Sequence, residues 1–330
     1  MAEGVYEDFA RWGRHAKDSP LYQALAEAVA GDEELLAVAA EIERPPRPNM
    51  LFAAVQFLLS ADDQLSQFYA SRTESPMAPE GAFPLFKAFV LDHVEPILEL
   101  GRTRYIQTNE VKRVAALLPA MMREADRLGE PVHVIEVGAS AGLNLCLDRY
   151  RYDFGGLEFG HSDVVLRVEL DGDVDVPTRA PYVQRRVGID LNPLDLNDPD
   201  DLRWLEALIW PEQVERRRRL RAAVRVRATV QVEMVRADAS SAIGGVLDRL
   251  PTGGPALVFH ALTVNQFSND ARERFDRALE SAAARRSISR IGFEYWDGTE
   301  DWPEIRVGLT EASLVPMMQA HPHGDWIRAL

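Results

Sequence analysis

The sequence predicts an α/β protein in which an all-helical N-terminal region precedes a domain built on a mostly parallel sheet. Up to about residue 129, apolar side chains recur at helical spacing and no stretch alternates as a strand would. From residue 130 onward, short apolar runs alternate with helical segments, which is the pattern of a parallel sheet covered on both faces. We therefore expect a helical region over 1–129 and a sheet domain over 130–330.

Prolines divide the helical region. Residues 45–48 and the loop at 75–84 each contain several prolines, which interrupt helices. The apolar spacing between these breaks predicts helices at 9–29, 50–59, 85–100 and 111–128.

Five apolar runs predict the parallel strands of the sheet domain, at 132–137, 187–190, 230–235, 255–259 and 288–295. Helices are expected at 202–226 and 269–284, and residues 151–187 read as a β insertion after the first strand–helix unit. The runs at 305–309 and 314–318 would form an antiparallel pair that completes seven strands. Pro316 weakens the second of these or confines it to an edge.

Composition limits the classes of partner. The hydrophobic fraction of 46% and charged fraction of 27% are ordinary for a soluble globular protein. A net charge of −15 argues against nucleic acid, because phosphate binding relies on Lys and Arg. The arginine run at 216–219 is expected to form a solvated face paired with acids. The single Cys146 excludes an intrachain disulfide and is expected to be buried. Without a signal peptide or long apolar span, we expect a cytoplasmic protein without a membrane partner.

The most informative motif follows the first expected strand. That strand ends in Glu136 and leads into a small-residue loop with Gly138 and Gly142, followed by a helix-compatible segment at 143–150. A P-loop would need Gly-Lys-Ser or Gly-Lys-Thr, and a dinucleotide loop would need Gly where Ser140 stands. The remaining pattern is acid-x-Gly-x-x-x-Gly, with the positive end of the following helix directed at the ligand.

This pattern resembles the first motif of class I S-adenosylmethionine-dependent methyltransferases. The cofactor carries an ammonium and a sulfonium but no phosphate, so an acid is useful at the end of the first strand. The resemblance implies that Asp190 holds the ribose hydroxyls, with Glu169 or Asp171 as rivals if the insertion is misread. It also implies a Rossmann-like methyltransferase sheet. The implied cofactor-binding residues are Glu136, Gly138, Ala139, Ser140, Gly142, Asn144, Asp190 and, on the adenine side, Asp238 and Ala239.

Segments at 107–110, 136–145, 148–152 and 321–324 together resemble the bacterial family catalogued as domain of unknown function 2332 (DUF2332). The resemblance extends over nearly the whole chain. It implies a methyltransferase-like domain behind a helical region, with no established reaction.

Candidate catalytic groups are His260, Glu294 and His323. His260 has a side chain suited to a general base, and a hydrogen-bonded structural histidine is the alternative. His321 and His323 form only a weak zinc pattern, so no metal site is expected. The residues expected to face a substrate or belong to a lid are Gln107, Asn109, Asn265 and Tyr295.

The leading hypothesis is an S-adenosylmethionine-binding protein that methylates a small molecule. Its rate would come mainly from holding the acceptor in line with the sulfonium. The alternatives are a methyltransferase-like binding or scaffold protein without catalysis and, less favoured, an NAD(P)-dependent oxidoreductase. The acceptor and the oligomeric state are not fixed by the sequence.

Overall fold

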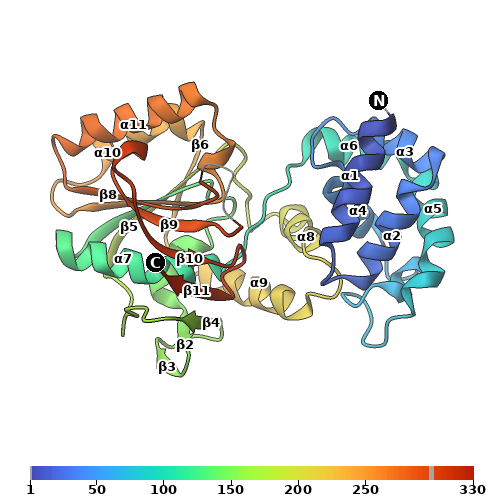
Figure 1. Ribbon diagram of the computed structural model, residues 1–330, viewed down its shortest axis with the longest axis horizontal. Coiled ribbons are helices and arrows are strands. Elements are labelled where there is room, and N and C mark those ends of the chain that lie inside the picture. The colour runs from blue at the N-terminus through green and yellow to red at the C-terminus, as the bar shows by residue number, and fades with distance from the viewer. Residues whose placement is uncertain (1, 297–300) are drawn as a thin grey trace. The chain divides into compact units, whose positions relative to one another are not determined.

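The computed structural model describes residues 2–296 and 301–330 and divides into two compact units. The first unit comprises the residues up to Thr108 together with Asn197–Arg218, and the second comprises Asn109–Leu196 with Arg219–Leu330 (Figure 1). The division differs from the expected one at 129 in two ways. The last helix of the N-terminal region belongs to the sheet unit, and a segment from the middle of the sequence completes the helical unit.

In the first unit the described residues form helices and no strand, as predicted. Rings of Phe9, Tyr22, Phe52 and Phe86 pack together in its core. The expected helices at 9–29 and 85–100 are each divided, the first at Ser19, which caps the second helix. The α-helices are α1 Ala2–His15, α2 Pro20–Ala30, α3 Glu33–Ala40, α4 Arg47–Leu58, α5 Ala82–Asp92, α6 Val94–Thr103 and α8 Pro199–Ala207, with 3₁₀ turns η1 Gln64–Phe68 and η2 Pro79–Gly81.

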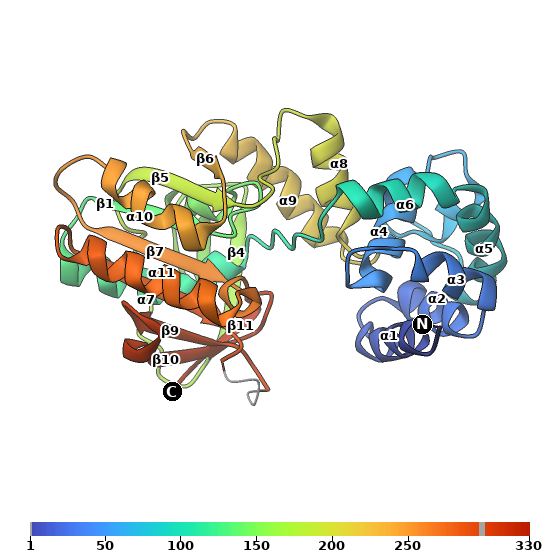
Figure 2. The same cartoon turned by 90° about the horizontal axis from the view of Figure 1, so that it is seen from above.

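The second unit contains five mutually parallel strands in the spatial order β6-β5-β1-β7-β8. Their bounds are β1 Val132–Val137, β5 Val183–Asp190, β6 Glu233–Arg236, β7 Ala256–Ala261 and β8 Ile288–Glu294. Counted along the chain, the order is third, second, first, fourth and fifth, so the direction of winding reverses between β1 and β7. Figure 2 shows β5, β1 and β7 side by side. All five predicted parallel strands are therefore present.

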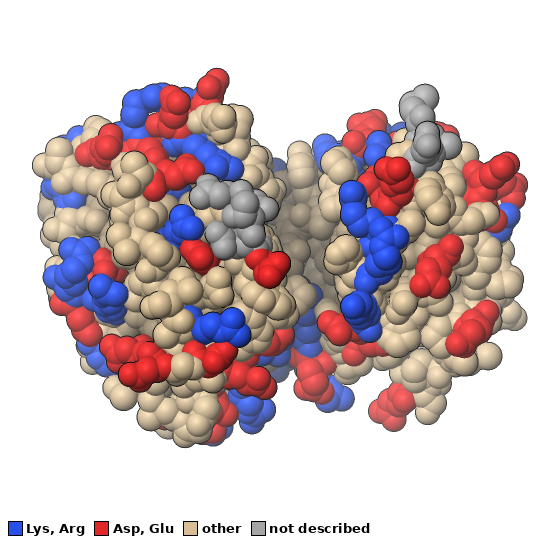
Figure 3. Space-filling model, viewed as in Figure 1, with Lys and Arg blue, Asp and Glu red and all other residues tan. Residues whose placement is uncertain are grey.

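Helices cover both faces of this sheet (Figure 1). Helices α10 (Ala239–Arg249) and α11 (Asn269–Ala283) pack on one face, where Ile135, Val258 and Phe275 belong to a common apolar core. Helix α7 (Arg113–Leu128) contacts β7 and β8 from the other face. On the face drawn in Figure 3, acidic and basic side chains are interspersed over this unit.

The sheet has eleven strands rather than the seven expected. Beyond β8 an antiparallel series follows, and the insertion adds three strands at the far end. Pro316 does not lie on an edge strand. It is accommodated at a register shift, where β11 pairs only with residues 318–320 of β10. The additional strands are β9 Glu304–Gly308, β10 Val315–Ala320, β11 Trp326–Ala329, β4 Val165–Asp171, β2 Arg151–Phe154 and β3 Leu157–Phe159; η5 (Glu311–Ser313) is the 3₁₀ turn between β9 and β10.

Two expected helices differ from the prediction. The segment after β1 is only a six-residue 3₁₀ helix, η3 (Asn144–Arg149), interrupted at Cys146. Such a short, irregular element has no appreciable dipole, so that part of the expected ligand cradle was wrong. The expected helix at 202–226 is divided into α8 and α9 (Val214–Arg227) around Pro211.

Two expectations from composition can be compared with the structure. Cys146 is buried, and burial raises the pKa of its thiol to about 12. In the arginine run, Arg218 pairs with Glu215 and Arg219 with Glu110, whereas Arg217 is buried rather than solvated. No helix of the described residues is long and apolar enough to cross a membrane.

Candidate functional site

The expected site residues of the second unit converge on one edge of the sheet. Because the five strands are parallel, their carboxyl ends share an edge, where open α/β sheets bind ligands. Glu136, Asp190, His260 and Glu294 lie at the ends of β1, β5, β7 and β8. Asp238 follows β6. The parallel pairing of these strands therefore places the five residues along one edge of the sheet.

The loop after β1, residues 138–142, uses its own backbone donors internally. The amides at 138 and 139 donate to the carbonyl oxygen of Ile189, at 2.8 and 3.3 Å. The amide of Ser140 donates to Oδ2 of Asp190 at 2.8 Å, and that of Gly142 to the carbonyl of Ala139 at 2.7 Å. These groups are thus unavailable to a phosphate, and the carboxylate of Asp190 beside them repels anions.

Glu136 is buried beside this loop, with 3% of its surface exposed. Its Oε1 accepts a hydrogen bond from Nδ2 of Asn144 at 3.0 Å, whereas Oε2 is buried and has no hydrogen-bond partner among the described residues. Burial raises the pKa of Glu136 to about 8, and the charge of Asp190 adds to the rise. The Asn144 hydrogen bond and the charge of Arg113 oppose it.

Two further side-chain oxygens in the segment that follows β1 are also buried without a hydrogen-bond partner in the described part of the chain. They are Oγ of Ser140 and Oδ1 of Asn144. Buried polar atoms are usually satisfied, so three such oxygens around one strand end indicate a missing donor. A ligand with N–H donors and positive charge would supply it.

The loops after β1 and β7 touch each other at Gly138. A Cβ atom on Gly138, whose φ is +76°, would overlap Oγ1 and Cγ2 of Thr263. Glycine is therefore required both by the backbone conformation and by the close approach. Gly142, at φ +70°, packs similarly against Met234.

The two later acids lie at the ends of the next two strands on one side of β1: Asp190 is the last residue of β5, and Asp238 follows β6. The strand beside β1 is β5, so the second-strand position belongs to Asp190; Glu169 and Asp171 lie on β4, which does not pair with β1. Asp190 also accepts the amide of Asn192 at 2.8 Å. Exposed Asp238 caps α10 through the amide of Ser240 at 2.8 Å, and Ala239 is the first residue of that helix. Asp238 is exposed at this edge, and its carboxylate has more acceptor sites than the one that caps the helix.

His260 is fully buried, and both of its ring nitrogens are engaged. Nδ1 lies 2.6 Å from Oε1 of Glu294, and Nε of Arg290 donates to Nε2 at 2.9 Å. Burial lowers the pKa of His260, so the ring is neutral and carries its proton on Nδ1. A general base needs a free nitrogen that faces its substrate. The geometry therefore favours the structural alternative for His260.

Glu294 organises the loop after β7. Its buried carboxylate accepts hydrogen bonds from the amides of Thr263 at 3.0 Å, Val264 at 2.9 Å and Asn265 at 3.3 Å, in addition to His260. Four donors satisfy both oxygens. Glu294 consequently fixes the loop that touches Gly138 and does not present a free oxygen to a substrate.

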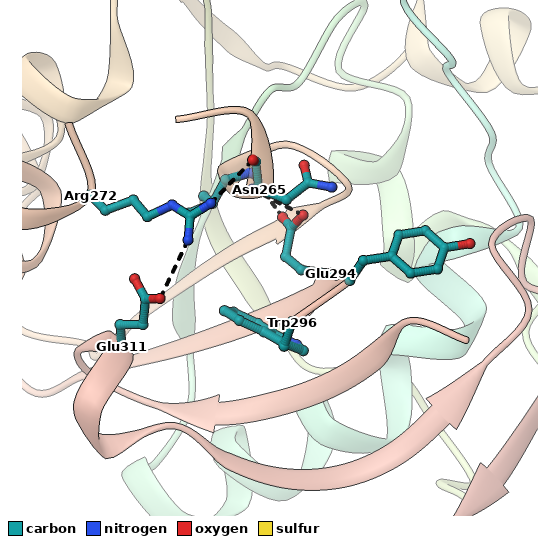
Figure 4. A pocket seen from close by; sticks show the side chains of 7 residues that line it. Asn265, Arg272, Glu294, Trp296 and Glu311 are labelled. Carbon is teal, nitrogen blue, oxygen red and sulfur yellow. Dashed lines mark hydrogen bonds and ion pairs between the residues drawn. The ribbon is translucent and has the colours of Figure 1, made fainter. Parts of the chain in front are cut away.

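A pocket of about 360 Å³ opens next to this loop (Figure 4). Asn265 and Tyr295, both expected to face a substrate, line it together with Glu294, Val264 and Trp296. Two of its lining residues were missed by the sequence reading, because α11 and η5 contribute them from elsewhere in the chain: Arg272 and Glu311.

The remaining expected residues lie outside this pocket lining. His321 Nδ1 is 2.9 Å from Oδ2 of Asp325, and the amide of His323 donates to the same nitrogen at 3.2 Å. Within the described residues no group of three potential ligands could hold a metal ion. Gln107 is near the end of the first unit's initial segment, whereas Asn109 begins the second unit and has a buried Nδ2 without a hydrogen-bond partner there.

The fold is that of an α/β protein with a mostly parallel sheet. Its candidate ligand site lies at the carboxyl edge of the parallel strands, where buried oxygens without hydrogen-bond partners among the described residues would suit a cationic group. The chain belongs to the family described as an uncharacterized protein conserved in bacteria (DUF2332), whose family model matches residues 4–329. The resemblance seen in the sequence is thereby confirmed at the level of the family. No curated protein matches the chain.

Proposed function

We propose that this protein binds S-adenosylmethionine at the carboxyl edge of its parallel strands and transfers the methyl group to a small molecule. The observation that carries the proposal is the buried carboxyl of Glu136, whose Oε2 has no hydrogen-bond partner beside a tight glycine loop. The strand order with its reversal between β1 and β7 is that of Rossmann-like sheets, which bind ligands at the reversal.

The residues present suit this cofactor. Glu136, Ser140 and Asn144 offer oxygens to the ammonium of the methionine part, and Gly138 lets a ligand approach the backbone. Asp190 would accept the ribose hydroxyls. Asp238 and Ala239, two strands from β1, would flank the adenine. When bound, the cofactor supplies an electrophilic methyl group on a sulfonium.

The same loop disfavours a dinucleotide. A pyrophosphate needs free backbone donors, but amides at 138, 139, 140 and 142 already donate within the protein. Two carboxyl groups, Glu136 and Asp190, stand where its negative charge would lie. The oxidoreductase alternative is therefore less favoured than a cationic cofactor.

The chain's own contribution to the reaction is positioning. Glu294 holds the loop between the glycine turn and the pocket, so cofactor and acceptor would meet at a fixed separation. Holding two reactants in line provides a large share of the rate enhancement of such transfers. No free base is assigned, since His260 is fully hydrogen-bonded. Asn109, the first residue of the second unit, is proposed to contact the bound ligand.

Calorimetry with S-adenosylmethionine and S-adenosylhomocysteine tests the proposal. We expect both to bind wild-type protein, and Glu136→Gln to weaken binding by roughly tenfold or more through loss of a charged hydrogen bond. The matched control is Glu124→Gln, which changes an equally buried carboxylate near the end of α7 that pairs with Arg127. This control should bind as wild type does.

A cationic ligand should also release a proton from Glu136, because positive charge stabilises its ionised form. The binding heat at pH 7 should accordingly change with the ionisation enthalpy of the buffer, and Glu136→Gln should abolish this dependence. Absence of binding to the intact protein, or equal binding by Glu136→Gln, would overturn the proposal. Tight binding without turnover over a broad panel of acceptors would instead favour the scaffold alternative.

A further inference from the structure

We propose that the pocket beside the β7 loop binds a small planar carboxylate, and that this is the class of acceptor. The naming of an acceptor rests on the function proposed above, whereas the binding of a carboxylate does not. The pocket measures about 360 Å³, room for on the order of ten water molecules. That volume suits a molecule with one or two fused rings.

Arg272 supplies the recognition group. Its Nη2 donates to the backbone carbonyl of Asn265 at 3.1 Å, and its Nη1 reaches Oε1 of Glu311 only at 3.5 Å. Its Nε is buried and has no hydrogen-bond partner among the described residues. A buried guanidinium N–H that lacks an acceptor calls for an oxygen, and a carboxylate matches the planar guanidinium with two parallel hydrogen bonds.

Glu311 competes weakly for the same guanidinium. It is 40% exposed on its side chain, and an ion pair of this length at the surface contributes little. A ligand carboxylate can therefore displace it. The exposed side chain of Asn265 adds an amide to the same wall.

Trp296 lines the pocket but is largely buried, with 6% of its surface exposed, and Arg306 covers one face of its ring. Its indole Nε1 donates to the carbonyl of Glu304 at 3.1 Å, and the guanidinium of Arg306 lies 5.1 Å from the ring centroid. In Figure 4 the indole is seen nearly edge-on between Glu311 and Glu294, with Arg272 above it. A planar ligand in contact with the exposed part of the indole would place its carboxylate toward Arg272.

The walls of the pocket are fixed from behind. Glu294 holds the backbone at 263–265, and Asp276 accepts the amide of Glu311 at 2.7 Å while it pairs with Arg290 at 2.8 Å. Arg290 in turn donates to His260. This buried network holds both sides of the pocket in place, so a ligand need not order them on binding.

The test uses three matched probes, benzoate, benzamide and benzylamine, titrated into the full chain by calorimetry without any cofactor. We expect benzoate to bind best. Arg272→Gln should weaken benzoate by roughly tenfold or more, because a bidentate charged contact is lost. The control Arg277→Gln lies on the same helix, where among the described residues it pairs with exposed Glu273, and it should change binding by less than about twofold.

Glu311→Gln distinguishes a pocket that binds carboxylates from one that binds cations. Removing the competing carboxylate should tighten benzoate binding by roughly threefold. Preferred binding of benzylamine, weakened by Glu311→Gln, would overturn the proposal and assign the pocket to cations. Failure of S-adenosylmethionine to bind while benzoate binding persists would contradict the proposed function alone. Failure of benzoate in a protein that binds the cofactor would contradict this inference alone.

Discussion

Glu136 and Glu294 are two buried carboxyl groups at the ends of parallel strands, and they differ in how their oxygens are satisfied. Glu294 accepts hydrogen bonds from four donors, three of them backbone amides. Glu136 accepts one, from Asn144, and its second oxygen has no hydrogen-bond partner in the described residues. Burial raises the pKa of Glu136 to about 8 because so little compensates it.

The difference suggests different roles: Glu294 is a structural carboxylate, whereas Glu136 has an oxygen that a ligand could satisfy. A buried charge is tolerated where donors surround it, and those donors then depend on it. A carboxyl with an unmet oxygen is costly to the free protein unless it is neutral or a cation arrives. This difference is why we propose Glu136 as the group that binds a ligand, while Glu294 maintains the loop beside it.

The largest effect on stability is expected for Glu294→Gln. The amide NH₂ would face backbone N–H groups that need an acceptor, so we expect the free energy of unfolding to fall by about 4 kcal/mol. Urea-induced unfolding followed by circular dichroism measures it. Glu311 is an exposed carboxylate that lines the same pocket, and the free energy of unfolding of Glu311→Gln should stay within about 0.5 kcal/mol of wild type. A small effect at Glu294 would show that its hydrogen bonds do not stabilise the loop.

The sequence predicted the positions of the two acids but not the number of hydrogen-bond donors around each. Both follow an apolar run, and that pattern correctly predicted β1, β5, β7 and β8 together with the acid at the end of three of them. The number of donors around each acid is set by tertiary packing. His260 illustrates this, because its second nitrogen is taken by Arg290, thirty residues away in a buried strand where an arginine is uncommon.

The antiparallel pair at 305–309 and 314–318 was predicted and is present as β9 and β10, whereas the division of the insertion into three strands and the lining of the pocket were not predicted, for the same reason. Strands of the insertion expose Leu157 and Leu170, so they lack the clean alternation that marks a half-buried strand. Arg272 on α11 and Glu311 on η5 are 39 residues apart in the sequence, and only the fold brings them to the same pocket. The sequence pattern after the glycine loop also indicated a helix at 143–150, where the chain forms only the short η3.

A second prediction concerns the contact that links the two acids, between Gly138 and Thr263. Gly138→Ala should lower the free energy of unfolding by about 3 kcal/mol, since it adds an unfavourable φ to an overlap with Thr263. It should also abolish cofactor binding by displacing the loop. Gly156→Ala, at φ +101° with open space around it, controls for the backbone term and should cost about 1 kcal/mol.

Thr263→Ala should recover part of the loss in the double variant, because it removes two of the three overlapping atoms. Equal effects at Gly138 and Gly156 would show that the two loops do not depend on each other. Full recovery by Thr263→Ala would show that the overlap, and not the positive φ, sets the cost.

The smallest expected effect is the contribution of Glu136 to the pH dependence of native stability. The unfolded chain ionises Glu136 near its ordinary pKa of 4.5, whereas the native protein keeps the proton up to about pH 8. Between these values the unfolded state binds fewer protons, so native stability falls as pH rises, and the fall ends above pH 8. From pH 6 to 7.5 this contribution amounts to roughly 2 kcal/mol. Glu136→Gln should remove it, while Glu124→Gln should keep it. Urea unfolding at both pH values gives the comparison, and parallel pH profiles for wild type and Glu136→Gln would mean that Glu136 is as well satisfied as Glu294.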